Sequence, residues 1–291
     1  MNKLTSDKHT PLDKRLQAID SVPTLPEVVE RLTVLLQNPK TSAEEVGKAI
    51  TADQALASKV LRLVNSAFYG FPGKIGSITH AVVILGFATV KNIVLTASIL
   101  DTFKQNGNKT ECFSPEQFWL HSIACGAAAK CIAKQIGLAN SEECFTAGLI
   151  HDIGKIILHQ YMAEDFQQVI HYAKENRMLF YACEKRLFNY THQEIGSELA
   201  HKWKLPSHLN DAIAFHHNPV STQENYSVIA VVHCADIFVR ALDYGNGGDA
   251  LVPLMNDGVW RNLGLNSASL LALFEMIGKE TQKANIFIQM V

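Results

Sequence analysis

The chain has 291 residues, with 26 lysines and arginines against 28 aspartates and glutamates. This near balance gives no overall field that would attract nucleic acid or an anionic membrane, so no direct nucleic-acid binding is expected. The length is sufficient for one large domain or two modest ones. The six cysteines include no C-x-x-C pair, and several fall in helical apolar patterns. They favour buried free thiols in a reducing cytosol over disulfides, so we expect a cytoplasmic protein.

The first hundred residues predict short helices that pack as a small bundle. Residues 28–36 carry apolar side chains at helical spacing. Ser42 with Glu45, and Thr51 with Gln54, match the capping box that begins a helix. This part of the chain concentrates no nucleophiles, carboxylate pairs or ligand clusters.

Residues 81–100 are apolar and about long enough to span a bilayer. Lys91 and Asn92 lie at the midpoint, however, where a lysine costs roughly 2.5 to 3.5 kcal/mol on insertion scales. Gly86 also interrupts the stretch. We therefore expect two short helices in a soluble core, and no membrane span.

The polar stretch 104–115 predicts the connection between two lobes, residues 1–108 and 109–291. Beyond it, Ser114 and the proline that follows open a long helix, which Gly137 should end. Little of the chain shows the alternation of a strand. The sequence therefore predicts an all-α fold, with an N-terminal helical bundle packed on a second helical lobe.

Seven polar residues of the second lobe lie at predicted helix ends or within apolar helices. They are His121, His151, Asp152, His192, His216, His217 and Asp236. Each has a structural explanation by itself; Asp236, for example, can pair with Arg240 one turn on. Together they favour a metal site, because a buried carboxylate needs a charge partner. Gly154 is expected to end the helix that leads into the adjacent histidine and aspartate.

Thr191 and Glu194 form a further capping box, which places His192 at the first position of a helix. A helix N-terminus disfavours imidazolium, so we expect His192 to be neutral and free to bind a metal. His233 is a candidate to contact a metal ligand without itself binding the ion.

The order of these residues, H, then HD-x-x-K, then H-x-x-x-G, then HH, then A-D, resembles the HD superfamily of helical metal-dependent phosphohydrolases in its two-metal form. The phrases VPTLPEVVERL, LASKVLRLVNSAFYG and ITHAVVILGFATVKNIVL resemble the HDOD family, the HD-related output domain of bacterial signalling proteins. The resemblance covers about residues 15–285. Many HDOD members have lost most of the HD ligands, whereas this sequence keeps them.

The resemblance implies that the second lobe is an HD-type metal-binding lobe, in which Asp152 bridges two metal ions. The other implied ligands are His121, His151, His192, His216, His217 and Asp236. Lys155 matches a lysine that contacts substrate phosphate in the HD-GYP branch. The resemblance therefore implies that Asp152 and Lys155 are the catalytic residues. The alternative for Lys155 is an ordinary solvated lysine. The segment after the double histidine, HHNPVSTQENYS, departs from that branch, so hydrolysis of cyclic di-GMP does not carry over. Gln117 stands where a third metal would need a carboxylate.

Imidazole and carboxylate ligands without a thiolate suit iron or manganese first, and nickel or zinc as alternatives. The favoured function is a metal-dependent phosphohydrolase or phosphodiesterase in bacterial signalling, acting on a nucleotide or other phosphate ester. A second hypothesis is a non-catalytic signalling scaffold, with a structural or vestigial metal site and an N-terminal lobe that binds a partner protein. A third is a di-iron oxygenase.

Overall fold

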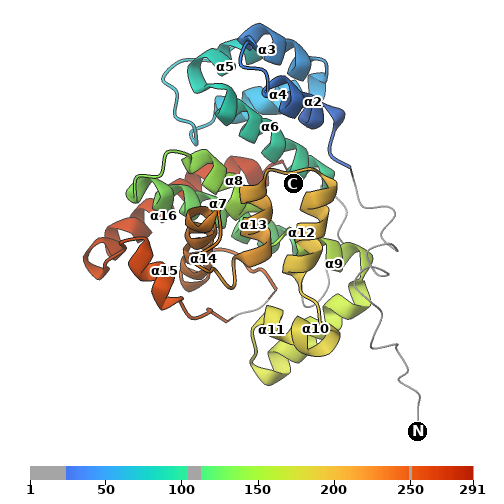
Figure 1. Ribbon diagram of the computed structural model, residues 1–291, viewed down its shortest axis with the longest axis vertical. Coiled ribbons are helices and arrows are strands. Elements are labelled where there is room, and N and C mark those ends of the chain that lie inside the picture. The colour runs from blue at the N-terminus through green and yellow to red at the C-terminus, as the bar shows by residue number, and fades with distance from the viewer. Residues whose placement is uncertain (1–23, 104–112, 249–250, 291) are drawn as a thin grey trace.

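The structure is a computed structural model that describes residues 24–103, 113–248 and 251–290. The described residues form helices and no β-strand, which confirms the all-α prediction (Figure 1). The predicted lobe boundary near residue 108 lies outside the described residues.

Five helices form one end of the molecule (Figure 1). They are α2 (Glu27–Leu35), α3 (Ala43–Thr51), α4 (Gln54–Val64), α5 (Ile78–Leu85) and α6 (Phe87–Thr102). The capping box of Ser42 and Glu45 begins α3 as predicted. The prediction for Thr51 is wrong, because Thr51 is the last residue of α3. Asp53 caps α4 instead, since its backbone is extended and its carboxylate accepts from the Leu56 backbone N–H.

The apolar stretch 81–100 contains parts of two helices, as predicted. α5 ends at Leu85, and α6 begins at Phe87. Gly86 separates them with a φ of 82°, a value that favours glycine. No helix in the described ranges is long and apolar enough to cross a membrane.

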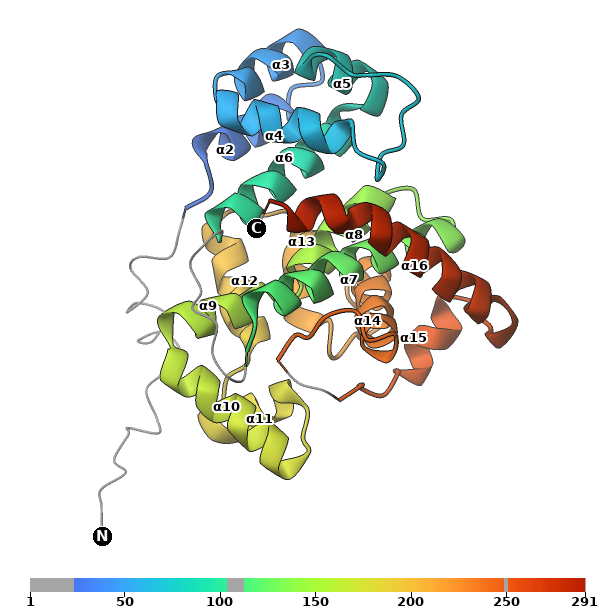
Figure 2. The same cartoon turned by 180° about the vertical axis from the view of Figure 1, so that it is seen from behind.

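Ten helices form the rest of the described chain. They are α7 (Pro115–Gln135), α8 (Ser141–Ile150), α9 (Ile153–Tyr161), α10 (Ala163–Asn176), α11 (Phe180–Phe188), α12 (His192–Lys202), α13 (Ser207–Phe215), α14 (Tyr226–Ala241), α15 (Asp257–Asn262) and α16 (Ser267–Ile288). Ser114 caps α7 and a proline occupies its first turn, as predicted. Helix α7 is central, with α8, α14 and α16 packed against it (Figure 2).

Small residues let α7 and α8 come close together. A Cβ added to Gly126 of α7 would lie 2.8 Å from the Phe145 carbonyl oxygen, and one added to Gly148 of α8 would lie 2.7 Å from the Cys125 carbonyl oxygen. Neither position has room for a larger side chain. This close approach brings His121 on α7 beside His151 at the end of α8.

Aromatic packing joins the N-terminal helices to the rest of the molecule. Phe68, just after α4, lies with its ring centroid 4.9 Å from that of Phe145 and 5.2 Å from that of Phe287. The Lys130 ammonium lies 4.1 Å from the centre of the Phe68 ring and 2.6 Å from a carboxylate oxygen of Glu142. One apolar core therefore runs from the N-terminal helices into α8 and α16.

The cysteines of the described ranges are buried and form no disulfide with one another, as predicted. They are Cys125, Cys131, Cys144, Cys183 and Cys234.

Candidate metal centre

The His151-Asp152 pair lies between two helices. Helix α8 ends at Ile150 and α9 begins at Ile153, so the prediction that Gly154 ends the first helix is wrong. Gly154 lies in the first turn of α9, where an added Cβ would be 1.9 Å from the His192 carbonyl oxygen. Glycine is needed there because α12 packs directly against α9. This contact places the start of α12 beside Asp152.

Helix α12 begins with the predicted capping box, in which the Thr191 backbone N–H donates to Glu194 across 2.6 Å. His192 is its first residue. Glu184 of α11 holds His192 twice, accepting from its backbone N–H at 3.0 Å and from Nδ1 at 2.7 Å. The ring of His192 therefore has a fixed orientation, with Nε2 turned toward Asp152.

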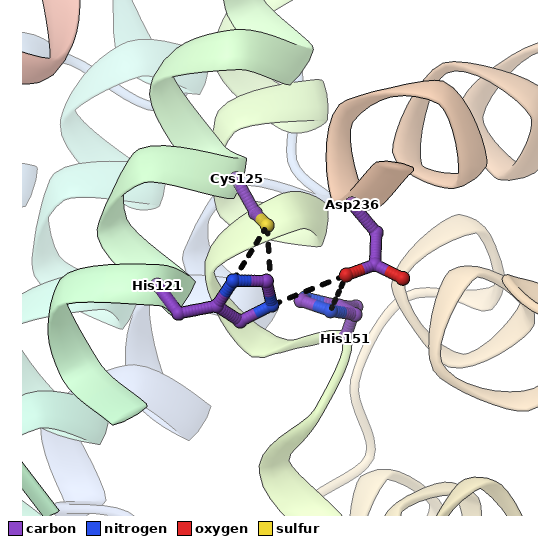
Figure 3. Close-up of side chains that lie close together, drawn as sticks. All are labelled: His121, Cys125, His151 and Asp236. Atoms are coloured by element: carbon purple, nitrogen blue, oxygen red, sulfur yellow. Dashed lines mark hydrogen bonds and ion pairs between the residues drawn. The ribbon is translucent and has the colours of Figure 1, made fainter. Parts of the chain in front are cut away.

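The seven predicted ligands and one further residue form two groups. Within each group, the possible ligand atoms all lie within 4.8 Å of one another. The first group is His121, Cys125, His151 and Asp236; the second is Asp152, His192, His216 and His217. Figure 3 shows the first group, to which α7, α14 and the end of α8 each contribute. Either group offers enough donors to hold a metal ion.

Asp152 lies between the two groups. Its Oδ2 is 3.4 Å from His151 Nε2, whereas its Oδ1 is 3.1 Å from His192 Nε2 and 3.6 Å from His216 Nε2. Each carboxylate oxygen therefore faces a different group. This is the arrangement by which one carboxylate can contact two metal ions at once.

Three histidines point Nε2 into the site because Nδ1 is already used. Nδ1 of His151 lies 2.7 Å from the Gly148 carbonyl oxygen, and Nδ1 of His216 lies 2.9 Å from that of Ile213. Nδ1 of His192 contacts Glu184, as described above. When Nδ1 carries the proton and donates to an oxygen, Nε2 is left with a lone pair that can bind a metal.

Two buried polar atoms of the site are left unpaired by the protein's own groups. Within the described part of the chain, His151 Nε2 and Asp152 Oδ1 have no hydrogen-bond partner. Asp152 Oδ1 nevertheless lies 3.1 Å from His192 Nε2. Two acceptors at this distance require a proton or a metal ion between them. The residues present therefore fit a metal.

The two aspartates are ionised although they are buried. Burial by itself would raise the pKa of Asp152, but Lys155, His151 and His192 hold that pKa well below its usual range. Burial would also raise the pKa of Asp236. The Arg240 guanidinium at 2.8 Å and two histidines nevertheless hold this pKa well below its usual range. Asp236 thus makes the predicted pair with Arg240 and also approaches His121 Nε2, at 3.2 Å. The pair with Arg240 is therefore present, and the same carboxylate also faces the first group.

The pKa values of the histidines are shifted in different directions. Burial lowers the pKa of His216 to about 4 and lowers the pKa of His217 well below its usual value, so both side chains are neutral at pH 7. For His192, burial lowers the pKa, but the Glu184 and Asp152 carboxylates outweigh it and the pKa is raised. The two carboxylates therefore act against the helix N-terminus, which by itself would favour a neutral His192.

Lys155 is fully buried, which excludes the alternative of a solvated lysine. Its Nζ donates to Asp152 Oδ2 at 2.7 Å and lies 5.1 Å from the centre of the Phe180 ring. A Cβ added to Gly247 would lie 3.2 Å from Asp152 Oδ2 and 3.4 Å from Lys155 Nζ. The backbone at Gly247 therefore covers this side of the site.

His217 is the most exposed of the seven predicted residues. Its ring stacks on that of Tyr181, with centroids 4.5 Å apart. Both residues line a cleft of about 680 Å³ whose other walls come from α11, α12 and the end of α13. Of the second group, His217 lines this cleft.

The sequence reasoning missed Cys125 and Glu184. Cys125 lies one turn after His121 on the same face of α7, a spacing that could have indicated it. Glu184 is fully buried, and a buried carboxylate in a helix was the signal that singled out Asp236. His233 contacts a candidate ligand, because its Nδ1 lies 2.7 Å from the His216 carbonyl oxygen.

These features define a helical protein with two adjacent, buried groups of side chains that could hold metal ions. The HDOD domain family model matches residues 22–219, so the chain belongs to the HDOD family, as the sequence resemblance indicated.

Solved structures share this fold. An HDOD domain protein of unknown function from Geobacter sulfurreducens is 27% identical, with a TM-score of 0.74 over 92% of this chain and 96% of that one. A candidate phosphohydrolase from Shewanella amazonensis SB2B is 25% identical, with a TM-score of 0.72 over 97% of this chain and 99% of that one.

A relative is also found by sequence. An uncharacterized protein of Treponema pallidum (strain Nichols) is 26% identical over 227 residues, or 77% of this chain, and the chain spans 43% of that relative's length.

Proposed function

We propose that the protein is a metal-dependent phosphohydrolase with a dinuclear metal centre, acting in bacterial signalling. The observation that carries this proposal is the position of Asp152, whose two oxygens face different ligand groups at 3.4 and 3.1 Å. The Shewanella amazonensis SB2B structure with the same fold is that of a candidate phosphohydrolase, which supports the same reaction class.

A pair of bound ions supplies a hydroxide at neutral pH and stabilises the attacking and leaving oxygens of a phosphoryl displacement. In this proposal Asp152 holds both ions. The Lys155 ammonium, next to Asp152, offsets negative charge on the phosphoryl oxygens. Iron or manganese are the first choices for the ions, with nickel and zinc as alternatives.

The cleft beside His217 gives a phosphate ester a path to the second group. Phe215, at its wall, is 39% exposed, so an aromatic face is available to a nucleobase. Lys185 and Asn218 also line the cleft and can donate hydrogen bonds to an anionic or polar ligand. A nucleotide or similar phosphate ester is therefore the proposed substrate class.

A non-catalytic signalling scaffold is the second candidate, and the closed site favours it. Lys155 already neutralises Asp152, and the backbone at Gly247 covers both. The N-terminal helices also expose Val34 and Val83, at 62% and 70%, so they offer apolar surface to a partner protein. In this case the metal would stabilise the fold and no ester would turn over.

A turnover assay separates the two candidates. The protein is loaded with iron, manganese, nickel or zinc in turn and screened against phosphate monoesters, nucleotides and cyclic dinucleotides, with Asp152→Ala as the inactive variant. Asp211→Ala is the control, because Asp211 lies on α13 outside both groups. Turnover lost only in Asp152→Ala supports the hydrolase. Full metal occupancy without turnover on any ester supports the scaffold, and a spectrum that changes between anaerobic and aerobic conditions would indicate a di-iron oxygenase instead.

A further inference from the structure

Cys125 is placed to contribute a sulfur atom to the first group. It is fully buried on α7, one turn after His121. Figure 3 shows its sulfur above the His121 ring, near both ring nitrogens, while Asp236 approaches the same ring at Nε2. The group that can share one ion therefore contains a thiol as well as two imidazoles and a carboxylate.

Two separations between the donor atoms are close to those expected around one metal ion. Ligands at about 2.3 Å for sulfur and about 2.05 Å for nitrogen, held at a tetrahedral angle, lie about 3.6 Å apart. Cys125 Sγ is 3.5 Å from His121 Nε2. The same geometry puts a nitrogen and an oxygen about 3.4 Å apart. His121 Nε2 and Asp236 Oδ1 are separated by 3.2 Å.

A second, independent observation points to a ligand in the same place. His151 is fully buried, and its Nε2 has no hydrogen-bond partner within the described residues. Its Nδ1 lies 2.7 Å from the Gly148 carbonyl oxygen, which fixes the ring so that Nε2 faces the group. Nε2 is 3.8 Å from Asp236 Oδ1, a separation that one ion can bridge.

We propose that Cys125 is a thiolate ligand of the first metal ion, which completes a site with His121, His151 and Asp236. This inference rests on the dinuclear centre proposed above and names one of its ligands. On binding, the sulfur forms a bond to the ion and the thiol proton leaves to the buffer. Thiolate is a soft ligand, so the first site prefers zinc or iron(II) to manganese, although the sequence had indicated a donor set without sulfur.

Cobalt(II) provides a readout that does not depend on activity, because cobalt bonded to thiolate has a charge-transfer absorption that imidazole and carboxylate do not give. The full chain is loaded with cobalt, and the wild type is compared with Cys125→Ser and Cys131→Ser. Cys131 is the matched control, since it is a buried cysteine on the same helix that packs in the apolar core outside both groups. We expect the band in wild type and Cys131→Ser, and its loss in Cys125→Ser.

A cobalt-loaded wild type without the band overturns the inference, as does a band that survives in Cys125→Ser. X-ray absorption of the zinc-loaded wild type needs no variant: one sulfur scatterer at about 2.3 Å supports the ligand, and a shell of nitrogen and oxygen only contradicts it. A sulfur-ligated ion in a protein without ester turnover defeats the proposed hydrolase but leaves the ligand assignment intact. Ester turnover without sulfur ligation supports the proposed hydrolase and overturns the Cys125 ligand assignment. A wild type that binds no metal overturns both proposals.

Discussion

Glu184 accepts two hydrogen bonds from His192. One carboxylate oxygen lies 3.0 Å from the His192 backbone nitrogen, and the other lies 2.7 Å from Nδ1. The two residues come from different helices, α11 and α12. His192 is thereby held in both position and ring orientation without a bound ion. Outer partners of this kind typically contribute tenfold or more to metal affinity.

Replacing Glu184 with glutamine should therefore weaken the second metal site. The amide keeps the shape but lacks the charge that supports the His192 ring. We expect the affinity for zinc at this site to fall about 10- to 100-fold, measured by competition with a chelator. Glu198→Gln is the control, because Glu198 lies on the same helix as His192 and lines the cleft. Equal affinities in the two variants would show that Glu184 does not support the ligand.

Gly154→Ala should destabilise the protein, because the new Cβ would lie 1.9 Å from the His192 carbonyl oxygen. Helix α9 and helix α12 would have to move apart. Overpacking of this kind costs about 1 to 3 kcal/mol or more in the free energy of unfolding, measured by urea denaturation. Gly73→Ala is matched to it, since nothing lies within 4 Å of a Cβ at Gly73. A Gly154→Ala protein as stable as Gly73→Ala would mean that the two helices are not in this contact.

Lys155→Met should destabilise the protein most when metal is removed. The substitution leaves the buried Asp152 carboxylate without the ammonium that lies 2.7 Å from it, and breaking a buried pair costs about 3 to 5 kcal/mol. A metal ion at Asp152 would replace part of that lost charge. Urea unfolding with EDTA and with zinc should therefore give a larger loss in EDTA than in zinc. An equal loss in both conditions would argue against metal binding at Asp152.

Phe68→Ala should loosen the N-terminal helices from the rest of the molecule. Phe68 is buried against Phe145 and Phe287, and truncating such a ring costs about 3 to 5 kcal/mol. Phe215→Ala, which removes a ring that is 39% exposed, is the control and should be close to neutral. Thermal unfolding of the two variants measures the difference. Equal midpoints would mean that the Phe68 contacts do not hold the two parts together.

Local features of the fold could be predicted from the sequence. The capping boxes at Ser42 and Thr191 begin helices, and Gly86 separates two others, because each signal lies within a few neighbouring residues. Thr51 was misjudged because a better cap, Asp53, lies two residues further on. The seven candidate ligands come together in two groups, although their role as ligands is still a proposal.

Features that depend on contacts between distant residues could not be predicted in this way. The need for glycine at position 154 comes from the His192 carbonyl, and the raised pKa of His192 comes from Glu184 and Asp152. Cys125 is a similar case. Its packing in an apolar helix was visible in the sequence, but the donors around it come from α14 and from the end of α8. Periodicity indicates which face of a helix is buried, but it does not indicate what lies opposite that face.

The central claim is that one chain holds two metal ions with Asp152 between them. Titration of the metal-free protein with zinc, followed by elemental analysis after desalting, tests it directly. We predict two equivalents of zinc per chain in the wild type, and a loss of zinc in Asp152→Ala with retention in Asp211→Ala. One equivalent or none in the wild type, or two equivalents in Asp152→Ala, would contradict the dinuclear centre.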